Sequence, residues 1–160
     1  MATIRPIKSK DDASLARIIK HLLKSFGLNI PGTAYFDPEL NQLSAYYAES
    51  DKRQYFVAIN DQGNVLGGVG IAEYDTEAGV AELQKLYLDQ KAQGQHLSYK
   101  LLDTAVEFAK QAGYQKLYLE TYHSLTTAIH LYQRYGFTNL GHPLNVAQHS
   151  TMDRFFIMNL

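Results

Sequence analysis

The sequence predicts an α/β fold in which a mixed, mostly antiparallel sheet is flanked by helices. Two segments, one near the N-terminus and one in the second half, place apolar residues at helical spacing. Between them lie short β-branched and aromatic runs joined by turn signals, the pattern of an antiparallel meander. The last of these runs, the following helix and one further strand make a strand–helix–strand unit, whose two strands must be parallel.

Length and composition fit one domain covering residues 1–160. The chain has a mass of 18.1 kDa and is 46% hydrophobic, which is enough for a core without disulfides. Fifteen Lys and Arg against sixteen Asp and Glu, without basic runs, argue against nucleic acid or a membrane surface as partner. There is no cysteine, no secretory leader and no apolar run long enough for a membrane span, so we expect a cytoplasmic protein.

The N-terminal part is expected to hold a short edge strand and two helices. Residues 3–6 are the strand. Apolar residues at positions 15, 18, 19, 22, 23 and 26 form one stripe of an amphipathic helix that starts at Asp11 and stops at Gly27. Asp37-Pro38-Glu39 has the order of an N-cap, a first-turn proline and a first-turn acid, which predicts a shorter helix through Tyr47.

The remaining segments complete the order β-α-α-β-β-β-α-β-α-β-β. Three strands are expected at residues 54–60, 65–74 and 80–88, with turns at 61–64 and 77–79. A helix over 97–112 leads to a strand at 116–122, and Ser124 is the expected N-cap of a helix that Gly136 ends. Closing strands are expected at 137–140 and 154–160, and an exposed edge there offers a surface for a homodimer.

The connection Gln93-Gly94-Gln95 between a strand and a helix has two interpretations. The first turn of a helix presents unpaired N–H groups and a positive dipole end, which suit a phosphate, and Gly94 permits a close backbone approach. An ordinary strand-to-helix turn would carry the same single glycine. The local spacing by itself favours the ordinary turn.

Three segments in order resemble the GNAT superfamily of acetyl-CoA-dependent N-acyltransferases. Residues 81–89 are similar to its fourth strand, and residues 93–98 (QGQHLS) to its pyrophosphate loop, Gln/Arg-x-x-Gly-x-Gly/Ala. Residues 128–137 (AIHLYQRYGF) are similar to its Ala-x-x-Leu-Tyr-x-x-x-Gly-Phe helix. The resemblance implies acetyl-CoA as co-substrate, bound by Leu86, Tyr87, Leu88, Gln93, Gly94, Gln95, His96, Leu97, Ser98 and Tyr99.

The loop departs from the family pattern at two positions. His96 stands where the family has glycine, and Ser98 where it has glycine or alanine. The imidazole either crowds the pyrophosphate, or turns outward, or donates a hydrogen bond to it. The departure motivates an alternative function, a non-catalytic GNAT-fold module that binds CoA or acts as a sensor.

The resemblance also implies direct attack of a neutral amine on the thioester, with a backbone N–H of residues 86–88 polarising the carbonyl. Tyr132 matches the family tyrosine that donates to the leaving thiolate, although its position also suits a core aromatic. Glu82, eleven residues before Gln93 in an apolar strand, is the expected base, because partial burial would raise its pKa toward neutrality. An ion pair with Lys85 or Arg53, or simple exposure, is the competing interpretation of Glu82.

The acceptor is expected to be the amine of a small molecule or peptide. Tyr35 and Tyr74 are candidate residues of its site, and Glu120 is the reserve base. The six histidines show no metal-ligand spacing, so no metal is expected.

Overall fold

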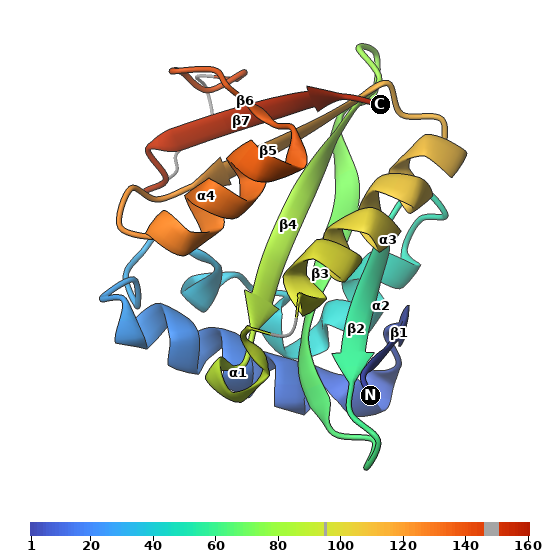
Figure 1. Ribbon diagram of the computed structural model, residues 1–160. Helices are drawn as coiled ribbons and strands as arrows, with labels where there is room; N and C mark the ends of the chain where they lie inside the picture. Colours follow the sequence, from blue (N-terminus) through green and yellow to red (C-terminus); the bar gives the residue numbers. More distant parts are fainter. Residues whose placement is uncertain (95, 146–150) are drawn as a thin grey trace.

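The computed structural model describes residues 1–94, 96–145 and 151–160, which form a seven-stranded sheet between helices (Figure 1). The strand order is β1-β2-β3-β4-β5-β7-β6, and among these strands only β4 and β5 pair in parallel. The predicted fold class and order of elements are confirmed. The strands are β1 (Thr3–Pro6), β2 (Gln54–Ile59), β3 (Val65–Asp75), β4 (Val80–Leu88), β5 (Lys116–Thr121), β6 (Thr138–Asn139) and β7 (Arg154–Asn159).

Helices cover both faces of the sheet. The α-helices are α1 (Asp12–Ser25), α2 (Leu43–Ala48), α3 (Leu97–Gln111) and α4 (Thr126–Tyr135). Short 3-10 turns are η1 (Ser9–Asp11), η2 (Ala34–Phe36), η3 (Leu40–Gln42) and η4 (Gln90–Ala92). Helices α3 and α4 pack on one face and α1 and α2 on the other (Figure 1). In the described part of the chain, none of these helices has the length and apolar character to cross a bilayer.

The alternation of side chains along β2 explains how one sheet supports two cores. Phe56 and Ala58 belong to the cluster under α3 and α4, whereas Tyr55 and Val57 belong to the cluster under α1 and α2. Because successive residues of a strand point to opposite faces, a register slip of one residue would exchange the two sets. Burial on both faces therefore fixes the register of the central strands.

Three local predictions are wrong. The second helix does not start at Asp37-Pro38-Glu39: α2 begins at Leu43, since the Asp37 carboxylate is engaged by Lys85 Nζ at 2.7 Å. Ser124 does not cap α4, whose N-cap is Leu125. The expected strand at 137–140 shrinks to β6, because the Phe137 N–H closes the end of α4 by bonding to the Tyr132 carbonyl oxygen at 3.0 Å.

The two parallel strands diverge after a short contact, and this positions the site. β4 pairs with β5 only at Val80, Ala81 and Glu82, although β4 continues to Leu88. In Figure 1 the two strands separate toward the C-terminal end of β4. The β5-facing edge of β4 beyond Glu82 consequently has no strand partner among the described residues.

Candidate active site

A β-bulge interrupts β4 beside the opening. Gly68 of β3 faces Tyr87 and Gly70 faces Gln84, so Val69 lies opposite both Lys85 and Leu86. Lys85 takes a left-handed conformation with φ of 51°, which is uncommon for a residue with a side chain. The buried Tyr55 hydroxyl donates a hydrogen bond to the Lys85 carbonyl oxygen at 2.8 Å. Tyr55, which lies in β2, therefore fixes the bulge of β4 across the intervening strand β3.

Glycines in β3 make room for the tyrosines that reach β4. A Cβ on Gly68 would lie 2.4 Å from Tyr55 Cε1, and a Cβ on Gly70 would lie 2.4 Å from the Tyr47 hydroxyl oxygen. Tyr47 uses that hydroxyl to donate to Gln84 Oε1 at 2.7 Å. Burial raises the pKa of both phenols well above its usual value, so both remain donors. The repeated glycines at 67, 68 and 70 were the sequence signal for this arrangement, which the sequence analysis missed.

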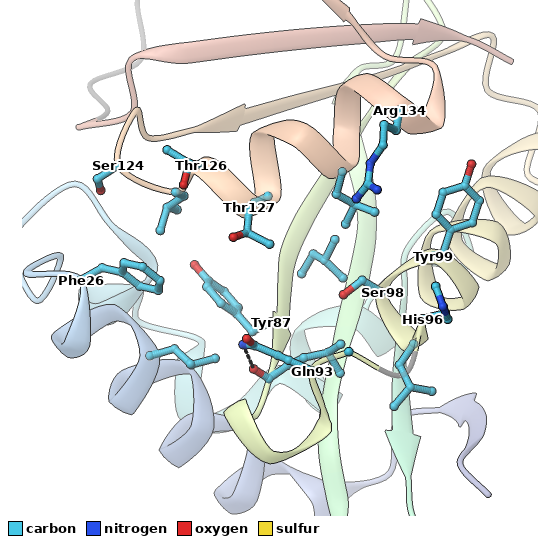
Figure 2. Close-up of a pocket in the computed structure, with 18 of the residues that line it drawn as sticks. Phe26, Tyr87, Gln93, His96, Ser98, Tyr99, Ser124, Thr126, Thr127 and Arg134 are labelled. Atoms are coloured by element: carbon cyan, nitrogen blue, oxygen red, sulfur yellow. Dashed lines mark hydrogen bonds between the residues drawn. The ribbon is translucent and has the colours of Figure 1, made fainter.

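A cavity of about 620 Å³ lies on the α3 and α4 side of the opening (Figure 2). Nine of the ten predicted cofactor-binding residues line it, namely Leu86, Tyr87, Leu88, Gln93, Gly94, His96, Leu97, Ser98 and Tyr99. The tenth, Gln95, lies outside the described residues. Most of the remaining wall is apolar and comes from α1 and α4, with Phe26 facing the cavity from the end of α1 (Figure 2). This cavity is called the donor cavity below.

The loop before α3 has the geometry of an anion site despite its histidine. Gly94 has φ of 85° and open space where a Cβ would be. His96 is the N-cap of α3 with φ of 58° and an exposed side chain, so it holds the left-handed conformation that glycine adopts at no steric cost. The first N–H groups of α3 are then free of intrahelical partners and lie at the cavity wall with Leu97 and Ser98. The backbone of the loop can receive a phosphate without help from the His96 side chain.

Arg134 is a cation of the donor cavity that the sequence analysis did not single out. It lies in the last turn of α4 and extends toward the part of the cavity lined by Ser98 and His96 (Figure 2). It forms no salt bridge with any residue in the described ranges. A guanidinium suits phosphate oxygens because its donors match their geometry. Its position inside the motif AIHLYQRYGF was the available signal.

A second cavity of about 350 Å³ lies on the α1 and α2 side and is called the acceptor cavity below. The two cavities share Leu23, Leu86, Tyr87, Leu125 and Ala128 as wall residues. They therefore meet where β4 and β5 diverge. Tyr132 lines the acceptor cavity with 6% of its surface exposed, and its hydroxyl makes no hydrogen bond with the described residues.

Glu82 lies in the acceptor cavity within a chain of hydrogen bonds. Gln84 Nε2 donates to Glu82 Oε1 at 2.8 Å, and Gln84 is itself held by Tyr47. Burial, followed by the charge of Glu120, raises the pKa of Glu82 above its usual value. Neither of the ion pairs considered for Glu82 forms, since Arg53 binds Glu73 and Glu49, and Lys85 binds Asp37 and lies near Glu39.

The three predicted acceptor residues fall in different places. Glu120 lines the acceptor cavity and accepts a hydrogen bond from the Tyr118 hydroxyl at 2.8 Å. Tyr74 lines neither cavity and packs on the Tyr118 ring, with centroids 4.8 Å apart. Tyr35 also lies outside both walls, against Phe36. Among the residues that the structure describes, no cluster of His, Cys, Asp and Glu could hold a metal ion.

Solved structures share this fold over nearly their whole length. A crystal structure of a GNAT-family acetyltransferase from Staphylococcus aureus superposes with a TM-score of 0.87 over 99% of both chains, at 22% identity. PaiA N-acetyltransferase from Thermoplasma acidophilum, crystallised with coenzyme A, superposes with a TM-score of 0.78 over 100% of this chain and 99% of its own, at 16% identity.

Sequence similarity identifies the family. Residues 16–137 match the Acetyltransferase (GNAT) family. The Escherichia coli (strain K12) protein YjgM, described as an uncharacterized N-acetyltransferase, is 32% identical over 148 residues, which cover 91% of this chain and 87% of YjgM. This chain belongs to the GNAT family of acetyltransferases, as its motifs predicted.

Proposed function

We propose that the chain moves an acetyl group from acetyl-CoA to a primary amine by direct attack. The observation that carries the proposal is the meeting of the donor and acceptor cavities at the unpaired edge of β4. A thioester in the donor cavity and an amine in the acceptor cavity would face each other there. Holding both reactants in contact is a large part of what catalysis requires.

The donor cavity supplies the groups for acetyl-CoA. Free N–H groups at the start of α3 and the Arg134 guanidinium bind the phosphates, and the apolar wall receives the pantetheine arm. Past the bulge, backbone N–H groups of residues 86–88 polarise the thioester carbonyl and stabilise the oxyanion that forms on attack. Tyr55 contributes indirectly, as a positioning residue for the bulge.

The acceptor cavity supplies the proton transfers. Glu82 takes a proton from the ammonium, and the neutral nitrogen attacks the carbonyl carbon. The C–N bond forms and the C–S bond breaks, while the Tyr132 hydroxyl donates a proton to the departing sulfur. Burial raises the pKa of the Tyr132 phenol above its usual value of about 10, whereas a thiol has a pKa of about 8.5. The phenol therefore stabilises the leaving sulfur by a hydrogen bond and passes its proton on only as the phenol oxygen receives one from the attacking nitrogen. The second proton of the attacking nitrogen restores Tyr132.

The test is an assay of thiol release from acetyl-CoA with a panel of primary amines, paired with calorimetric titration of CoA. Turnover that depends on the amine, with the acetylated amine identified by mass, supports the proposal. CoA binding without turnover on any amine would instead favour the non-catalytic CoA-binding or sensor module that the substituted loop suggests. Absence of CoA binding would overturn both.

A further inference from the structure

The acceptor cavity carries an excess of negative charge. Its wall includes the carboxyl groups of Asp37, Glu39, Glu82 and Glu120, and Lys85 as a cation. Lys85 is already committed, because its Nζ lies 2.7 Å from Asp37 Oδ2 and 3.6 Å from Glu39 Oε1, with 8% of the side chain exposed. Glu82 and Glu120 therefore remain without a cation in the described part of the structure.

Within residues 1–94, 96–145 and 151–160, the hydrogen-bond partners of these two carboxyl groups are neutral. Glu82 accepts from the Gln84 amide and Glu120 from the Tyr118 hydroxyl. A half-buried carboxylate loses hydration, and a neutral hydrogen bond replaces only part of it. A cationic ligand would supply the missing charge.

The register of the sheet places the two carboxyl groups side by side. Glu82 pairs with Tyr118 across β4 and β5, and Glu120 follows two residues later on the same face of β5. With a rise of about 3.3 Å per residue and about 4.8 Å between strands, their Cα atoms start roughly 8 Å apart. Two positive groups on one short alkyl chain can reach both.

A second observation marks the same cavity as a ligand site. Tyr132 lines its wall with 6% of its surface exposed, and its hydroxyl makes no hydrogen bond with the described residues. The hydroxyl keeps accessible surface, so it is free to bond to a ligand that enters the cavity. The cavity thus combines a hydroxyl that is free to bond with an excess of negative charge.

We propose that the acceptor is a small amine with a second positive charge and no carboxylate, that is, a diamine or polyamine. Glu82 takes the proton of the attacking amino group, and Glu120 binds the ammonium at the other end of the chain. This inference rests on the proposed acetyl transfer. Amino acids are disfavoured, because a carboxylate in this cavity would face like charges.

The experiment compares putrescine, n-butylamine and γ-aminobutyrate as acceptors for the full chain. The three share one carbon chain and end in an ammonium, a methyl and a carboxylate group. We expect kcat/KM for putrescine to exceed that for butylamine about 10-fold or more, since the second ammonium gains a charged hydrogen bond. We expect γ-aminobutyrate to be the poorest, and the advantage of putrescine to fall as salt is added.

The Glu120→Gln variant separates selectivity from activity. It should reduce kcat/KM for putrescine much more than for butylamine, so that the ratio between them approaches one, whereas Glu107→Gln on the exposed face of α3 should keep the ratio. Equal use of putrescine and butylamine by the unaltered chain, or preference for γ-aminobutyrate, would overturn the inference and leave acetyl transfer standing. Failure to acetylate any amine would overturn the proposed function itself.

Discussion

The donor and acceptor cavities meet at one strand but are built in different ways. The donor cavity uses backbone N–H groups, an apolar wall and the Arg134 cation, which has no salt bridge in the described part of the chain. Most of its polar wall comes from residues 93–94, 96–99 and 124–134. The acceptor cavity uses charged side chains from several separated segments, including Asp37, Glu82 and Glu120. A backbone site accepts whatever phosphate chain fits it, whereas a side-chain site selects by charge.

This difference indicates which cavity binds the co-substrate and which cavity determines the choice of amine. The donor side can serve the same co-substrate with many sequences, because its N–H groups belong to every residue. The acceptor side depends on which side chains meet there, so a single substitution can change the preferred amine. The bulge at Lys85 connects the two cavities. It leaves backbone groups of β4 free on the donor side, and it places Lys85 in the wall of the acceptor cavity.

Glu82→Gln is expected to have the largest effect. Loss of a general base should lower kcat by about 100-fold or more while the KM for acetyl-CoA changes little. In the unaltered chain, activity should rise with pH through the raised pKa of Glu82, because only the ionised form accepts a proton, and the variant should lose this rise. Steady-state rates across the pH range measure both the loss of kcat and the loss of its pH dependence, with Glu107→Gln as control. If the variant still lost activity at low pH as the unaltered chain does, Glu82 would not be the general base.

Tyr132→Phe should lower kcat by about 10-fold with a nearly unchanged KM for acetyl-CoA, since the phenol assists only the departing sulfur. Steady-state kinetics with varied acetyl-CoA provide the measurement. The ring packs against Phe137 and Phe156, and phenylalanine keeps that packing. An unaffected kcat would leave Tyr132 as a core aromatic alone.

Tyr55→Phe should lower kcat by several-fold, because the Lys85 carbonyl loses its anchor and the bulge becomes less well positioned. The matched control is Tyr114→Phe. Tyr114 is also buried and its hydroxyl donates to a backbone carbonyl, that of Lys52 at 2.9 Å, but it lines neither cavity. Each variant should lose about 1 kcal/mol of unfolding free energy. Equal kcat values for the two would show that Tyr55 serves stability only.

Arg134→Gln should raise the KM for acetyl-CoA several-fold and leave kcat almost unchanged, since the guanidinium is exposed and screened by solvent. The KM of the unaltered chain should increase with salt more steeply than that of the variant. Arg17→Gln, on the exposed side of α1, is the control for general charge effects. Equal salt slopes would contradict a phosphate contact at Arg134.

His96→Gly is expected to have the smallest effect on stability and on CoA affinity. Relief of the left-handed strain and the added freedom of glycine, each about 1 kcal/mol, should nearly cancel in the unfolding free energy. CoA affinity from calorimetry should be preserved or slightly higher. A marked loss of affinity would mean that the imidazole itself contacts a phosphate.

The contrast between the cavities also explains how much could be predicted from sequence. The order of elements, the bounds of β4 and the donor loop depend on periodicity and on glycines within short segments, and these patterns are visible along the chain. The acceptor cavity depends on contacts between residues far apart, such as Lys85 with Asp37, and on a bulge that reverses the expected alternation at one position. Tyr35 and Tyr74 are candidates by residue type, whereas their packing places them outside both cavities.

The roles of Arg134, Tyr47 and Tyr55 could not be predicted from the sequence. Each role depends on partners that come together only in the folded sheet. The glycines at 68 and 70 are meaningful once the rings that occupy their space are known.

The most direct test is a crystal structure with a bisubstrate analogue in which the sulfur of CoA is joined through an acetyl linker to a nitrogen of putrescine. The account predicts the diphosphate at the start of α3, the linker carbonyl beside the amides of residues 86–88, and the free ammonium near Glu120. A diphosphate bound away from this loop, or an alkyl chain directed out of the acidic cavity, would contradict it.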